Sequence, residues 1–206
     1  MSEDFFATLI GNPSRARLLR LFVANPSEVL TLAQAARRAG VSTPAAGKEI
    51  RFLENLGLIK KGRLSIALSG GKRAVAGKQK EDAWSADPSF KYLAPLSKFL
   101  HEVSPVHHES ILSGLKGSGR FKAAILSGSF MGDPSRPADL LVAADALNED
   151  RLEAAVRALE RQCGREIRYA AFSTPEFRYR LTVQDRLIRD TLDFPHLVLL
   201  DKGRLL

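Results

Sequence analysis

The sequence predicts an α/β fold in two domains, one of helices and a hairpin and one of a mixed sheet with flanking helices. The chain has 206 residues, of which 45% are hydrophobic, and this length exceeds what one small domain needs. Apolar residues recur at three- and four-residue steps up to residue 56 and alternate after it, which indicates helices followed by strands. From residue 119 onward, strand-like apolar runs alternate with helical stretches. The predicted domains span residues 1–80 and 119–206, with a helical linker over 81–118.

The net charge of +8 is concentrated near the N-terminus. Residues 1–80 contain 14 lysines and arginines against 5 acidic residues, whereas residues 81–206 contain 17 against 18. A local excess of this kind favours an anionic partner such as nucleic acid. The alternative interpretation is a solvated basic surface.

Cysteine content and hydropathy bear on the compartment. The single cysteine, Cys163, excludes a disulfide framework and predicts a reducing environment, the cytoplasm. No apolar run reaches the roughly 20 residues of a membrane span, and the first residues lack the pattern of a signal peptide, so no membrane association is expected.

Residues 32–62 predict a helix-turn-helix motif. Thr31 can cap a first helix, and Gly40 stands where that helix must end. Ser42 or Thr43 can cap a second helix that begins near residue 44. A preceding helix with a strongly apolar face is expected to support this pair, with three arginines pointing outward: Arg15, Arg17 and Arg20.

The second helix of the motif has an apolar face and a basic face. Its predicted buried stripe consists of Ala46, Ile50, Leu53 and Leu56, at three- and four-residue steps. A helix of this size fits the major groove of DNA, with its N-terminal residues at the base edges and cations beside them on phosphates. The residues predicted to make groove contacts are Ser42, Thr43, Lys48 and Arg51.

The residues after Gly57 predict a two-stranded ribbon beside this helix. Apolar residues alternate up to residue 68, the sequence SGGK then provides a glycine turn, and residues 73–77 can return as a second strand. Residues 78–88 are polar and predict a linker. The ribbon carries five cations that can contact phosphates or the minor groove: Lys60, Lys61, Arg63, Lys72 and Arg73. The alternative is an exposed hairpin with solubilising charges.

The segment LIGNPSRARLLRLFVANPSEVLTLAQAARRAGVSTPAAGKEIRFLENLGLIKKG, within residues 5–78, resembles the winged-helix domain of ArsR-type bacterial and archaeal repressors. The resemblance implies a transcriptional regulator that binds double-stranded DNA as a homodimer, with the helix near residues 43–56 in the groove. It does not imply metal sensing, because the thiolate and imidazole clusters of the metal-responsive members are absent.

Residues 90–115 predict two further helical stretches. Trp84 and the aromatic residues that follow it are expected to form an interdomain or dimer contact. Because His107 and His108 are adjacent, their imidazoles do not share one helical face, so these residues and His101 are interpreted as surface histidines and no metal site is predicted.

Residues 121–139 contain a strand-like run, a turn of small residues and a polar loop that leads to a second strand. Gly128 and Ser129 can let backbone and hydroxyl groups approach a phosphate, and Asp139 begins a strand whose end can hold a metal-bound nucleotide. This order resembles the minimal nucleotidyltransferase fold, in which a GS turn is followed by two acidic residues on the next strand. The three residues occupy matching places. A helix over 149–163 and strands over 166–173 and 196–200 agree with the same family.

Two departures from that pattern predict a catalytically inactive domain. Pro137 stands where the first acidic residue is expected, and Arg168 stands where a third carboxylate would help to hold a second metal. Two-metal transfer needs carboxylates that bind both cations, and Asp133 and Asp145 are poorly placed to replace them. No catalytic residue is therefore predicted, and the only cofactor left open is a nucleotide with Mg²⁺.

These patterns together predict a DNA-binding transcriptional regulator. Its C-terminal domain is expected to serve in dimerisation, nucleotide sensing or binding of a protein partner. One alternative is an active nucleotidyltransferase that modifies a protein or RNA and is targeted by the N-terminal domain. Another is an interaction protein whose N-terminal domain docks on a protein.

Overall fold

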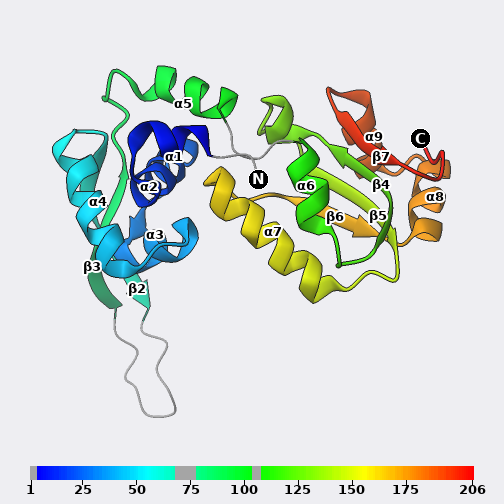
Figure 1. The fold of residues 1–206 in the computed structure, drawn as a ribbon, viewed down its shortest axis with the longest axis horizontal. Coiled ribbons are helices and arrows are strands. Elements are labelled where there is room, and N and C mark those ends of the chain that lie inside the picture. The colour runs from blue at the N-terminus through cyan, green and yellow to red at the C-terminus, as the bar shows by residue number, and fades with distance from the viewer. Residues whose placement is uncertain (1–3, 68–77, 104–107) are drawn as a thin grey trace, which may run out of the picture. The chain divides into compact units, whose positions relative to one another are not determined.

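The computed structural model describes residues 4–67, 78–103 and 108–206 (Figure 1). Helices and strands both contribute to the fold, which confirms the predicted α/β class at this level. The chain forms two compact units: unit 1 comprises Met1–Pro105 with Arg161–Arg165, and unit 2 comprises Val106–Glu160 with Glu166–Leu206. Among the described helices, none has the length and apolar character that crossing a membrane would require.

The helices of unit 1 begin and end at the residues that their local sequences favour. They are α1 (Phe5–Ile10), α2 (Pro13–Ala24), α3 (Leu32–Ala39), α4 (Thr43–Asn55) and α5 (Leu93–Glu102). Thr31 and Gln34 form a capping box at the start of α3, and Gly40 ends this helix in the left-handed region, at φ 63°. Ser42 caps α4: its Oγ accepts a hydrogen bond from the Ala45 amide at 3.4 Å. The end of α3 and the start of α4 thus lie where these residues predict them.

A three-stranded antiparallel sheet completes unit 1. Its strands are β1 (Leu30–Thr31), β2 (Ile59–Ala67) and β3 (Lys78–Ala86), in the order β1-β3-β2. β2 and β3 pair along their whole length, from Ile59 opposite Ala86 to Ala67 opposite Lys78. The interpretation of residues 78–88 as a linker is therefore wrong for residues 78–86, which form β3. The polar composition of this segment does not indicate a strand. The return strand predicted at residues 73–77 lies outside the described residues.

Two predictions about the core of unit 1 are wrong. Leu56 is 52% exposed because α4 ends at Asn55, and Leu58 is fully buried instead. Arg20 does not point outward: it is 3% exposed, and its two terminal amino groups donate to the Asp4 carboxylate at 2.6 Å each. Burial of this arginine is tolerated because its charge is paired.

Unit 2 is built on a four-stranded mixed sheet. Its elements are α6 (His108–Leu115), β4 (Arg120–Leu126), a 3₁₀ turn η1 (Gly128–Met131), β5 (Leu140–Asp145), α7 (Glu149–Cys163), β6 (Tyr169–Phe172), α8 (Thr174–Thr182), α9 (Arg186–Asp193) and β7 (Leu197–Asp201). The strand order is β6-β5-β4-β7, with β5 and β6 parallel and the other pairs antiparallel. Consecutive residues of β4 and β5 are buried, so both faces of these central strands are covered, which explains their continuous apolar runs.

The boundary between the units differs from the predicted one. The segment expected to be a helical linker, residues 81–118, is divided: most of β3 and all of α5 belong to unit 1, and α6 belongs to unit 2. Trp84 lies on β3, packs against the core of unit 1 and donates from its indole N–H to Glu54 Oε2 at 3.1 Å. Its described contacts are thus inside unit 1.

Candidate functional site

The two units differ in net charge. Unit 1 holds 18 lysines and arginines against 9 acidic residues, and unit 2 holds 13 against 14. Among the described residues of unit 1, ion pairs join Arg15 to Glu49, Arg20 to Asp4, Arg38 to Glu28 and Lys61 to Asp82. Paired cations stabilise the unit locally and contribute less to attraction of an anionic partner. Cations that lack such a partner therefore contribute more to the long-range attraction of an anion.

Four of the predicted contact residues are exposed cations without such a partner: Lys48, Arg51, Lys60 and Arg63, hereafter the unpaired cations. Within the part of the chain that the structure describes, no carboxylate lies within 4.0 Å of their charged groups. Ser42 and Thr43 are also exposed, at the start of α4. Lys72 and Arg73 lie outside the described residues.

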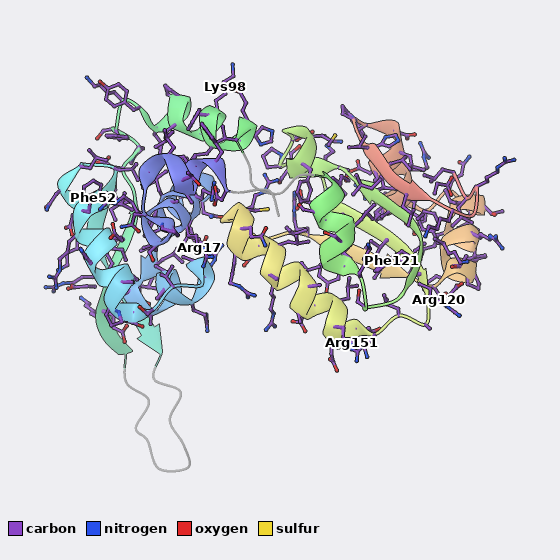
Figure 2. All side chains as sticks on the ribbon, in the orientation of Figure 1. Arg17, Phe52, Lys98, Arg120, Phe121 and Arg151 are labelled. Atoms are coloured by element: carbon purple, nitrogen blue, oxygen red, sulfur yellow. The ribbon has the colours of Figure 1, made fainter. Side chains whose placement is uncertain are left out.

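Helix α4 presents its unpaired cations on one face. Lys48 and Arg51 are exposed, as is Phe52, which is labelled on α4 in Figure 2. The opposite face is anchored in the core by Ile50 and Leu53, which are 1% and 0% exposed. Since this packing fixes the rotation of α4 about its axis, it also fixes which side chains reach solvent.

The ribbon cations are split between its two faces. Because successive side chains of a strand point to opposite faces, Lys61 and Arg63 share one face and Lys60 lies on the other. Trp84 is paired opposite Lys61 and bonds to Glu54 of α4, so the Lys61 face is the one turned toward α4. Of the two unpaired ribbon cations, Arg63 is therefore the one that shares a side with α4.

A buried carboxylate within α4 was not predicted. Glu49 is 3% exposed; its Oε1 accepts from Asn12 Nδ2 at 2.9 Å and its Oε2 accepts from Arg15 Nε at 2.7 Å. The helical period contains the signal for this burial, because Glu49 stands three residues after Ala46 and four before Leu53, both in the buried stripe. A charged residue on that stripe indicates a partner on another element.

In unit 2, the structure brings together the three residues predicted to bind a nucleotide. Antiparallel pairing places the end of β4 beside the start of β5, so Gly128 and Ser129 lie next to Asp139. The Ser129 amide donates to Asp139 Oδ1 at 2.7 Å. Gly128 has φ +54°, and a Cβ at this position would lie 2.5 Å from Asp139 Oδ1. Glycine is thus required for the turn to approach the carboxylate.

The Asp139 carboxylate is held by Arg168. Oδ1 accepts from Arg168 Nη2 at 2.9 Å, and Oδ2 accepts from Arg168 Nε and from the Arg168 amide, both at 3.0 Å. Burial by itself would raise the pKa of Asp139, but these bonds and that of Ser129 outweigh it and lower the pKa below its ordinary value of 3.8. Asp139 is therefore ionised, with a guanidinium as its counter-ion.

Backbone amides of the turn that follows β4 are also hydrogen-bonded within the protein. Four of them donate to acceptors in the protein: Ser129 to Asp139 Oδ1, Phe130 to the Ser127 carbonyl, Gly132 to the Ser129 carbonyl and Asp133 to the Gly128 carbonyl. A phosphate-binding turn needs amides that point to the ligand. A phosphate bound to these four amides would have to replace bonds that the turn already makes.

The two carboxylates of unit 2 considered as replacements, Asp133 and Asp145, have partners of their own. Asp145 is the last residue of β5, and the usual rise per residue of a strand places it about 20 Å from Asp139. It accepts from Thr174 Oγ1 at 2.6 Å. Asp133 accepts from the amide and hydroxyl of Ser135 and pairs with Arg136 at 2.8 Å. Across the described residues, no group of three or more His, Cys, Asp or Glu side chains is arranged to hold a metal ion.

The chain matches no protein-family model, no curated protein and no solved structure. No relative therefore assigns a role to these residues. The functional assignment rests on the chemistry of the two sites, since a fold alone does not determine function.

Proposed function

We propose that the protein is a transcriptional regulator whose unit 1 is a winged-helix domain that binds double-stranded DNA. Three helices followed by an antiparallel ribbon agree with this assignment. The observation that carries it is the state of the cations on α4: Lys48 and Arg51 are exposed and, among the described residues, unpaired, whereas four other cations of the same unit are paired with carboxylates. Exposed cations on a helix that fits the major groove are suited to phosphates and guanine edges.

A homodimer is part of the proposal. Two copies related by a twofold axis present two α4 helices to half-sites about one helical turn apart on the duplex. Unit 2 is proposed to be a nucleotidyltransferase-like domain without catalysis, which serves dimerisation or binding of a partner. The engagement of Asp139 by Arg168 supports this, because the carboxylate that would hold a metal already has a cation.

The test of the proposal is the salt dependence of duplex binding. A random-sequence duplex of about 30 base pairs accommodates two half-sites one turn apart. We expect the logarithm of the association constant to fall linearly with the logarithm of salt concentration, with a slope of about −0.9 per neutralised phosphate. Selection from a random library should then enrich a sequence with twofold symmetry. Salt-insensitive binding, or no binding to any duplex at about 0.05 M salt, would refute the proposal.

The two faces of the ribbon give a second prediction. Arg63→Ala should weaken duplex binding more than Lys60→Ala, because Arg63 lies on the α4 side of the ribbon and Lys60 does not. Each variant removes one exposed cation whose charged group has no carboxylate within 4.0 Å among the described residues, so each is the control for the other. The expected change in salt slope is about one for Arg63→Ala and close to zero for Lys60→Ala, measured by fluorescence anisotropy. Equal losses of affinity would show that the ribbon lies edge-on to the duplex.

A further inference from the structure

Arg15, near the start of α2, is held in one orientation by two side chains of α4. Its Nε donates to Glu49 Oε2 at 2.7 Å, and its guanidinium carbon lies 3.7 Å from the centroid of the Phe52 ring. Glu49 is itself fixed by burial and by Asn12. The ion pair and the cation–π contact together immobilise a side chain that would otherwise have many rotamers.

The rest of the guanidinium remains available. Within the described residues, the structure gives no acceptor to the two terminal amino groups of Arg15, and this side chain is 26% exposed. Phe52 beneath it is 42% exposed. Lys48 stands one helical turn before Phe52, so the two lie on the same side of α4. The Arg15 guanidinium therefore lies on the same side of α4 as Lys48, one of the unpaired cations.

From this arrangement we propose that Arg15 is a preorganised contact to a DNA phosphate beside α4. The inference rests on the proposed function of unit 1 and adds a residue from α2 to the interface. Terminal amino groups of a planar guanidinium match the oxygens of a phosphodiester, and an arginine that is already ordered loses little conformational entropy on binding. Because Glu49 balances its charge, Arg15 contributes hydrogen bonds and orientation rather than net charge.

A double substitution tests the contact without changing net charge. Arg15→Met/Glu49→Met removes both members of the ion pair, which avoids leaving the buried Glu49 carboxylate uncompensated, and apolar residues of similar size are tolerated at such positions. We expect the affinity for the selected duplex to fall about tenfold, the effect of losing a charge-assisted hydrogen bond, while the salt slope stays unchanged. Arg38→Met/Glu28→Met removes another Arg–Glu pair of unit 1 and should bind as the wild type does.

Methylphosphonate substitution identifies the phosphate. Replacing each phosphate of the bound site in turn should reveal one position at which neutralisation weakens the wild type about tenfold and leaves the double variant unaffected. Arg15→Lys, which keeps the charge but not the planar fork, should lose the same coupling and serves if the double variant does not fold, as judged by Trp84 fluorescence. Wild-type affinity in a folded double variant, or coupling at no phosphate, would overturn the role of Arg15 while leaving DNA binding intact. A wild type that binds no duplex would overturn both proposals.

Discussion

Arg168→Ala is expected to destabilise unit 2 by about 2–3 kcal/mol near pH 7. Removing the side chain takes two hydrogen bonds and the counter-ion from Asp139, whose side chain is 2% exposed. The loss should be smaller than the roughly 3–5 kcal/mol typical of a fully buried pair. Two backbone amides would still donate to the carboxylate, and the Arg168 side chain is 43% exposed in the native protein.

The loss should depend on pH in a defined direction. The pKa of Asp139 is lower in the folded protein than its ordinary value of 3.8, so the pair contributes stability that is fully present above that value. This contribution disappears as the pH falls through the folded-state pKa, because a neutral carboxyl group does not need the guanidinium. The difference between wild type and Arg168→Ala should therefore be largest near pH 7 and should shrink below about pH 4.

Urea unfolding can assign this loss to unit 2. Trp84, the single tryptophan, lies in unit 1, so its fluorescence follows that unit, whereas far-UV circular dichroism follows both. Only the dichroism transition should move in Arg168→Ala. Arg157→Ala is the matched control, since the Arg157–Glu153 pair is 65% and 51% exposed and such pairs contribute about 1 kcal/mol or less. Equal effects of the two substitutions, or a loss that does not change with pH, would contradict the role given to the pair.

The double variant Lys48→Ala/Arg51→Ala is expected to bind a duplex one to two orders of magnitude more weakly than the wild type does at about 0.1 M salt. Both residues lie on the exposed face of α4 and neither is paired within the described chain, so their removal should leave the stability of unit 1 almost unchanged. The salt slope should decrease by about two, one for each phosphate that is no longer neutralised. If Arg51 contacts a base edge instead, the slope should decrease by about one, and discrimination between selected and random duplexes should weaken.

A charge-matched control separates this effect from the net charge of the protein. Lys91→Ala/Lys98→Ala removes two exposed cations from the segment that leads into α5 and from α5 itself, where Figure 2 shows Lys98 away from α4 within unit 1. This variant should retain most of the affinity. Similar decreases in affinity for both double variants would mean that duplex binding depends on the overall positive charge rather than on α4.

The features of unit 1 that depend on local sequence could be predicted. Each helix cap depends on residues three or four positions apart, as with Thr31 and Gln34 at the start of α3. Both ends of α3 and the start of α4 were therefore identifiable from a few residues. β3 was not, because its sequence is polar and its conformation is stabilised by pairing with β2 rather than by its own alternation.

The ion pairs that define the two sites could not be predicted. Arg15 and Glu49 are 34 residues apart in sequence, and Asp139 and Arg168 are 29 apart. The absence of a carboxylate at position 168 was visible in the sequence, but the contact that the arginine makes there was not. Pairing over such separations depends on how helices and strands pack, and a single sequence does not contain that information.

Thr31 links the ribbon to the helices mechanically. It is the last residue of β1, where it is paired opposite Ala83 of β3, and it is also the cap of α3. Displacement of β3 therefore acts on the first turn of α3, and α3 packs against α4. If unit 1 binds a duplex as proposed, a load on the ribbon is therefore transmitted to α4 through the first turn of α3, and the ribbon and α4 should move together.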